Sequence, residues 1–202
     1  MFYRVIKSVE RFTGETGGTG LQTAKLTDEE MISRIQQGET GLLELLIDRY
    51  YDDIYYFCRS KIGDSEAAYD CAQETFLKLT RYISGYREQQ KFKGYLFSIA
   101  RNVCHDYFRG KPPDMAGEEV LETLAAGDVF SGKEDAYLLE RALALLSEGQ
   151  RETVMLRFYY GFKVREIAKI TGVPLAAAKS RLRRGLQKLK EIMEKEEMFC
   201  DR

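Results

Sequence analysis

The side chains best suited to chemistry in this sequence are the cations and the hydroxyl between residues 179 and 188. Lysine and arginine bind phosphate, and arginine can hold the O6 and N7 atoms of guanine with two parallel hydrogen bonds. Apolar residues recur here at helical spacing and predict one buried stripe, made of Leu175, Ala178, Leu182, Leu186 and Leu189. The polar side chains fall off that stripe and form an open face suited to DNA: Lys179, Ser180, Arg183, Arg184, Gln187 and Lys188.

The segment before this basic helix completes a DNA-binding layout. Residues 164–171 have a helical pattern, and Thr171 and Gly172 supply the chemistry of a tight turn. Pro174 suits the first turn of the second helix, where its missing N–H costs nothing. Two helices around a turn, the second one basic, favour a helix-turn-helix motif over an ordinary solvated face. Lys163 and Arg165, at the start of the first helix, are expected to contact phosphate groups.

Charge is distributed unevenly along the chain. The 202 residues include 31 lysines and arginines and 32 acids, for a net charge of −1. Residues 147–190 hold 11 of these cations against three acids, which leaves 20 cations against 29 acids elsewhere. This asymmetry predicts that one part of the chain binds DNA and that another part binds a different partner. The near-neutral whole is expected to bind DNA weakly when alone.

Neither a membrane segment nor a cofactor site is predicted. No apolar run approaches the roughly 18 residues that cross a bilayer, and the N-terminus lacks a signal core. We therefore expect a cytoplasmic protein with no direct membrane insertion. Spacings among the cysteines and His105 match no standard zinc signature, so we expect reduced, buried thiols with no metal and no cofactor. The cysteines are Cys58, Cys71, Cys104 and Cys200.

Helical periodicity throughout predicts an all-α fold, with two small helical domains joined by a flexible acidic linker. Thr27, followed by three acids, marks the first helix start. Two prolines end the first domain, and the segment after them carries seven acids against one lysine. The expected divisions are a mobile tail at 1–25, a first domain at 26–111, the linker at 112–135, a second domain at 136–196 and a tail at 197–202.

The first domain carries a polar helix face. Asp70, Gln73 and Glu74 are spaced i, i+3 and i+4, so they share one side of a helix. Paired carboxylates could serve acid–base catalysis or bind a metal, and an exposed polar face could equally bind another protein. Because no further Asp, His or Cys cluster completes a catalytic site, an enzyme built on Asp70 and Glu74 is the least favoured function.

Aromatic and basic residues interleave between positions 81 and 111. Aromatic faces with nearby cations suit unpaired bases, because stacking is worth about 1–3 kcal/mol per base and tolerates any sequence. Phe97 and Tyr107 are instead expected in the core, while Arg101, His105 and Arg109 lie four apart on another helix face. The segment thus predicts a surface for opened, single-stranded nucleic acid.

These parts, in this order, resemble a bacterial RNA polymerase sigma factor of the extracytoplasmic-function group. The resemblance runs from about residue 26 to residue 190 and lacks sigma region 3. The motif Asp70-x-x-Gln73-Glu74-x-Phe76 is similar to the core-binding helix of region 2. Residues 91–109 look like the promoter-melting and −10-reading segment, with Tyr95 where the family usually has tryptophan. Residues 145–158, 166–168 and 179–182 look like region 4.

The resemblance implies a sigma factor that binds core RNA polymerase and directs promoter-specific transcription initiation, and that is not itself an enzyme. The implied partners are the β′ clamp and β flap of the core polymerase, promoter DNA and an anti-sigma factor. The implied core-binding residues are Asp70, Gln73, Glu74 and Phe76. The −10 set is Tyr86, Lys93, Tyr95, Arg101, Asn102 and Arg109. The −35 set is Lys163, Arg165, Lys179, Ser180, Arg181, Arg183 and Arg184.

The alternative is a helix-turn-helix transcriptional regulator without polymerase core binding, whose first domain binds a ligand or dimerises. The interleaved aromatic and basic residues argue against it, since a protein that reads only duplex DNA needs no single-strand surface.

Overall fold

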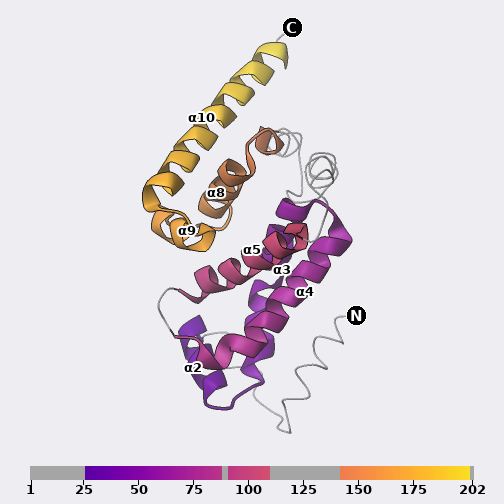
Figure 1. Cartoon of the computed structure of the whole chain (residues 1–202), viewed down its shortest axis with the longest axis vertical. Coiled ribbons are helices and arrows are strands. Elements are labelled where there is room, and N and C mark those ends of the chain that lie inside the picture. Colours follow the sequence, from indigo (N-terminus) through magenta and orange to yellow (C-terminus); the bar gives the residue numbers. More distant parts are fainter. Residues whose placement is uncertain (1–25, 88–90, 110–141, 201–202) are drawn as a thin grey trace.

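The structure, a computed structural model, describes residues 26–87, 91–109 and 142–200, with side chains through residue 192. Within these ranges all regular structure is helical, which confirms the all-α prediction (Figure 1). The elements in chain order are α2 (Asp28–Gln36), α3 (Leu42–Ile62), α4 (Ser65–Tyr82), the short η2 (Ile83–Gly85), α5 (Phe92–Arg109), α8 (Glu148–Phe158), α9 (Val164–Thr171) and α10 (Leu175–Cys200). The expected N-terminal tail and acidic linker lie outside the described residues, and α10 stays helical past residue 196.

Local sequence signals explain where the first helices begin and end. The Thr27 hydroxyl accepts a hydrogen bond from the Glu30 N–H at 3.2 Å, and the Glu30 carboxylate accepts one from the Thr27 N–H at 2.8 Å. This capping box satisfies donors that the helix start leaves unpaired, and it confirms the helix start predicted at Thr27. Gly63 ends α3 with a φ of 85°, a conformation that favours glycine, and Asp64 caps α4.

The N-terminal unit comprises α2 to α5, with α3 at its centre. Leu46, Ile54 and Phe76 are among its most buried side chains. Burying apolar side chains of this size stabilises a fold by about 1.5–3 kcal/mol each. An ion pair between Arg49 and Asp28, at 2.7 Å, joins α2 to α3. The helices of this unit therefore hold α4 and α5, which carry the predicted site residues, against one core.

The C-terminal unit comprises α8, α9 and α10, and it confirms the helix-turn-helix motif. Gly172 adopts a left-handed φ of 66° directly after α9, and the Val173 N–H donates to the Ala168 carbonyl at 3.0 Å. The predicted buried stripe of α10 is wrong at Leu186, which is 38% exposed. Gly185 faces α8 instead: a Cβ there would lie 3.0 Å from Cγ2 of Val154, so the two helices approach closely.

The two units pack together through α5 and α9, which lie side by side (Figure 1). Phe57 and Phe97 from the N-terminal unit share one core with Tyr160, Phe162 and Ile167 from the C-terminal unit. The sequence predicts two domains connected by a linker, and nothing in its pattern predicts this contact. We call the contact between α3 and α5 on one side and residues 148–171 on the other the interdomain interface.

Cys58, Cys71 and Cys104 are free, buried thiols, as expected. Hydrogen bonding to Cys58 and burial raise the pKa of the Cys104 thiol, which keeps it neutral. Within the described ranges, no group of three or more His, Cys, Asp or Glu side chains is arranged to hold a metal ion. Nor does any helix there have the length and apolar character needed to span a bilayer.

Candidate nucleic-acid interface

The helix-turn-helix presents an open basic surface. Lys179, Arg183 and Arg184 are exposed on α10. Among the described residues, none of the three forms an ion pair with an acid. Lys163 occupies the N-cap position of α9 and Arg165 lies in its first turn, and both are exposed. A helix N-terminus favours anions, so this position suits a phosphate group.

Arg181 differs from the other predicted −35 residues. It is half-buried, and its guanidinium packs over Gly149 at the start of α8. A Cβ added at Gly149 would lie 3.3 Å from the Arg181 Cζ, so the two helices are fitted closely there. Arg181 therefore anchors α10 to α8 in this structure, and a DNA contact from it stays a prediction.

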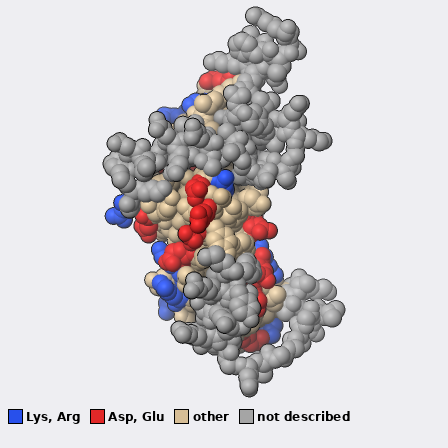
Figure 2. Space-filling view, turned by 90° about the vertical axis from the view of Figure 1, so that its right-hand side faces the viewer, with Lys and Arg blue, Asp and Glu red and all other residues tan. Residues whose placement is uncertain are grey.

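The polar face of α4 is accessible in part. Asp70 is exposed, whereas Gln73 and Glu74 are half-buried. Acidic side chains gather near the middle of the face shown in Figure 2, the side of the molecule along which α4 runs in Figure 1. Phe76, the fourth predicted core-binding residue, is 1% exposed, and its ring stacks on Tyr51 with centroids 5.8 Å apart, so a direct contact with the polymerase stays a prediction. Phe76 therefore supports this face from within the core.

One face of α5 is open to solvent. Tyr95, Asn102 and Arg109 recur seven residues apart, and Asn102 and Arg109 are exposed. The Tyr86 ring lies 4.9 Å from the Tyr95 ring, so the structure brings these two predicted residues together. We call Tyr86, Tyr95, Asn102 and Arg109 the open face of α5. Tyr82, absent from the predicted set, is the last residue of α4 and is 60% exposed.

A glutamine from α2 holds the turn that precedes the open face. The Gln36 amide donates hydrogen bonds to two backbone carbonyls, those of Ile83 at 2.8 Å and of Tyr86 at 2.9 Å. No sequence pattern connects Gln36 with a turn 47 residues further along. The neighbouring Gln37 instead contacts Ser33 within its own helix.

The opposite face of α5 is covered by the C-terminal unit. Lys93, Phe97 and Arg101 recur four residues apart on this face. The Lys93 ammonium pairs with Asp53 at 2.9 Å and lies 5.7 Å from the ring centroids of Phe97 and Phe162. The Arg101 Nε lies 3.2 Å from an oxygen of Glu152. Two cations of the predicted −10 set are therefore bound within the protein.

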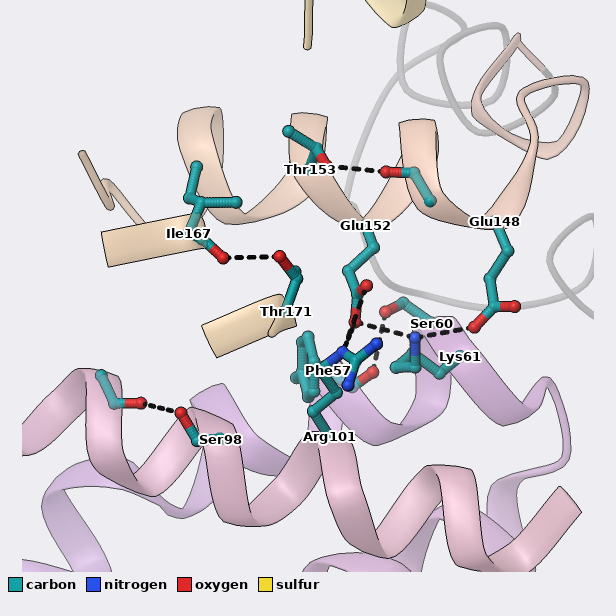
Figure 3. A network of polar contacts seen from close by, with 12 residues as sticks. Phe57, Ser60, Lys61, Ser98, Arg101, Glu148, Glu152, Thr153, Ile167 and Thr171 are labelled. Carbon is teal, nitrogen blue, oxygen red and sulfur yellow. Dashed lines mark hydrogen bonds and ion pairs between the residues drawn. The ribbon is translucent and has the colours of Figure 1, made fainter. Parts of the chain in front are cut away.

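A buried ionic network connects α3, α5 and α8 at this interface (Figure 3). The Lys61 Nζ lies 2.9 Å from Glu152 and 3.0 Å from Glu148. Burial opposes the charge on Lys61, but the two carboxylates outweigh it and raise the pKa of the ammonium. The Lys61 charge in turn lowers the pKa of Glu148. The sequence gives no sign of this network, because Lys61 resembles an ordinary surface lysine near a helix end.

Comparison with known proteins relates both units to one family. The model of Sigma-70 region 2 matches residues 46–111, and the model of Sigma-70, region 4, matches residues 137–189. The ECF RNA polymerase sigma factor BldN of Streptomyces coelicolor is 30% identical over 172 residues, which cover 81% of this chain and 65% of BldN. SigW of Bacillus subtilis, also an ECF RNA polymerase sigma factor, is 28% identical over 178 residues, which cover 81% of this chain and 95% of SigW.

A solved structure has a similar fold. The sigma factor RpoE from Bartonella quintana, in a co-crystal with the anti-sigma factor NepR, aligns with a TM-score of 0.61 at 22% identity. The alignment covers 75% of this chain and 96% of that one.

Proposed function

Because the chain belongs to the extracytoplasmic-function group of the sigma-70 family of RNA polymerase sigma factors, we propose how its surfaces divide the recognition of a promoter. It is a sigma factor, which binds core RNA polymerase and directs promoter-specific transcription initiation. The alternative of a regulator that never binds the polymerase is not favoured, since the region 2 match accounts for most of the first unit. We take the chain itself to have no catalytic activity and to act in the cytoplasm, where the polymerase works.

Region 4 reads the −35 element. Lys179, Arg183 and Arg184 offer side chains to base edges in the major groove, with Ser180 beside them. Lys163 and Arg165 contact phosphates and set the orientation of the motif on the duplex. The observation that supports this assignment best is the set of exposed cations on α10, the helix that follows the Gly172 turn.

Region 2 reads and melts the −10 element through the open face of α5. Its tyrosines provide ring faces for opened bases, and its arginine and asparagine provide donors for the backbone and base edges. Lys93 and Arg101, the other two cations of the predicted −10 set, lie on the opposite face of α5, where they pair with Asp53 and Glu152, and a DNA contact from them stays a prediction.

Partner proteins bind other faces. Asp70, Gln73 and Glu74 lie on the face of α4 that we assign to the β′ clamp, and region 4 is assigned to the β flap. An anti-sigma factor is a further proposed partner, because the similar Bartonella quintana protein was solved with one.

The test is core binding followed by run-off transcription. The purified chain should be retained by core RNA polymerase and should start transcripts at one class of promoter. The double variant Gln73→Ala, Glu74→Ala should lose core affinity while its far-UV circular dichroism stays unchanged. A helix-turn-helix regulator would neither be retained nor start transcripts, and that result would refute the proposal.

A further inference from the structure

We propose that Tyr82 is a further DNA-binding residue of region 2, and that its ring stacks on an opened base at the border of the open face of α5. Tyr82 is the last residue of α4 and is 60% exposed. The proposal rests on the proposed function of region 2. It adds a third tyrosine, contributed by a different helix, to the two tyrosines of the open face.

The spacing of α4 directs Tyr82 toward the core side of that helix. Thr75 and Leu79 are buried there, and Tyr82 continues the same stripe three residues after Leu79. The core ends before this last position, so the ring is left in solvent at a position of the stripe that α4 otherwise buries. Single exposed apolar side chains are common on protein surfaces, so exposure alone assigns no role to the ring. The neighbours of the ring supply the further evidence.

Lys78 shows that this side of α4 borders the open face of α5. It precedes Tyr82 by one helical turn, and its ammonium lies 3.7 Å from the carboxylate of Asp106 on α5. Asp106 is one turn away from both Asn102 and Arg109, which are residues of the open face. Tyr82, on the same side of α4 as Lys78 and one turn further along, therefore lies beside the surface that we assign to opened DNA.

The short η2 turn fixes Tyr82 relative to the tyrosines of the open face. It begins directly after Tyr82 and ends directly before Tyr86. The Gln36 amide donates to the Ile83 carbonyl at 2.8 Å and to the Tyr86 carbonyl at 2.9 Å, so one side chain holds both ends of the turn. The Tyr86 ring in turn contacts the Tyr95 ring, with centroids 4.9 Å apart. Tyrosines from α4, from the turn and from α5 thus border one surface.

The ring of Tyr82 is available for a base, and cations adjoin it in the chain. In the part of the chain that the structure describes, Tyr82 makes no hydrogen bond and contacts no other aromatic ring. Arg81 precedes it, Arg87 follows Tyr86, and both arginines are exposed. Within the same ranges neither arginine forms an ion pair with an acid. An unstacked ring near unpaired cations suits single-stranded DNA, because the ring stacks on a base and the cations bind phosphates.

Stacking requires the ring of Tyr82 but not its hydroxyl. Tyr82→Phe should therefore keep the affinity for opened DNA. Tyr82→Leu should lose affinity as Tyr82→Ala does, because leucine is apolar but offers no aromatic face. Phe158 provides a matched control, since it is also the last residue of a helix, is 64% exposed and lies outside the residues assigned to DNA. Phe158→Ala should leave the affinity for opened DNA within about twofold of the wild type.

The experiment measures binding of the holoenzyme to a fluorescein-labelled promoter whose −10 element is kept open by a mismatched template strand. Tyr82→Ala and Tyr82→Leu should bind this opened probe about tenfold more weakly than the wild type, a shift equivalent to 1.4 kcal/mol. Bases of the opened non-template strand are then removed one at a time. At the base that stacks on Tyr82, the wild type should lose about tenfold and Tyr82→Ala less than about twofold, since its contact is already absent.

Wild-type affinity of either Tyr82→Ala or Tyr82→Leu for the opened probe would overturn the proposal. Equal losses in the wild type and Tyr82→Ala at every removed base would also overturn it, because Tyr82 would then support the fold without touching a base. Unchanged circular dichroism and core affinity establish that each variant is folded. A wild-type holoenzyme that binds the opened probe no more tightly than the paired promoter would instead refute the proposed function of region 2.

Discussion

The substitution Lys61→Met tests the ionic network directly, because methionine keeps most of the length of the side chain and removes its charge. Lys61 is 8% exposed and supplies the cation at 2.9 Å from Glu152, whose side chain is 4% exposed. Removing one partner of a buried pair costs about 3–5 kcal/mol, since the remaining charge stays desolvated. Arg101 still lies 3.2 Å from Glu152, so the lower end applies, and we expect a loss of about 3 kcal/mol in unfolding free energy.

The assay is urea unfolding of the full chain at pH 7, monitored by far-UV circular dichroism. Lys78→Met is the matched control, because Lys78 pairs with the exposed Asp106 at 3.7 Å and should lose less than about 1 kcal/mol. The double variant Lys61→Met, Glu152→Gln should recover about half of the loss, since it no longer buries an unpaired carboxylate. A loss at Lys61 no larger than that at Lys78 would show that the network does not hold the two units together.

Three further predictions concern DNA binding and packing. Gln36→Ala should slow open-complex formation, measured by permanganate reactivity of promoter thymines, and should leave core affinity unchanged. The control Gln37→Ala should change neither quantity. Normal thymine reactivity in Gln36→Ala would show that the turn does not need the Gln36 hydrogen bonds. Arg184→Ala should relax preference at particular −35 bases. Lys163→Ala should instead weaken binding to every sequence and reduce the slope of log affinity against log salt concentration by about one. Both variants are measured as holoenzymes against a promoter library at two salt concentrations. Equal weakening by both would mean that α10 positions the protein without reading bases. Gly185→Ala should lower the unfolding free energy by about 1 kcal/mol, because overpacking against α8 exceeds the gain in helix propensity; a rise in melting temperature would contradict this.

Local signals were sufficient to predict most of the helices. The capping pair at Thr27 and the glycine turn at Gly172 involve residues within a few positions of each other, so their chemistry is visible in the sequence. Phe76 entered the predicted core-binding set through its motif, and the motif alone does not show that its ring is buried against Tyr51 of α3. The predicted burial of Leu186 was wrong because Gly185 faces α8 in its place, where the close approach of the two helices requires a residue without a side chain.

The interdomain interface could not be predicted, because its partners are chemically ordinary and distant in sequence. Lys61 and Glu152 are 91 residues apart, and either one alone has the pattern of a solvated surface residue. Helical spacing does place Lys93, Phe97 and Arg101 on one face of α5, but spacing cannot show what covers that face. Cations bind the phosphates of opened DNA and the carboxylates of a protein by the same electrostatic attraction. The sequence of α5 is therefore compatible with either partner, and only the structure shows that the C-terminal unit covers this face.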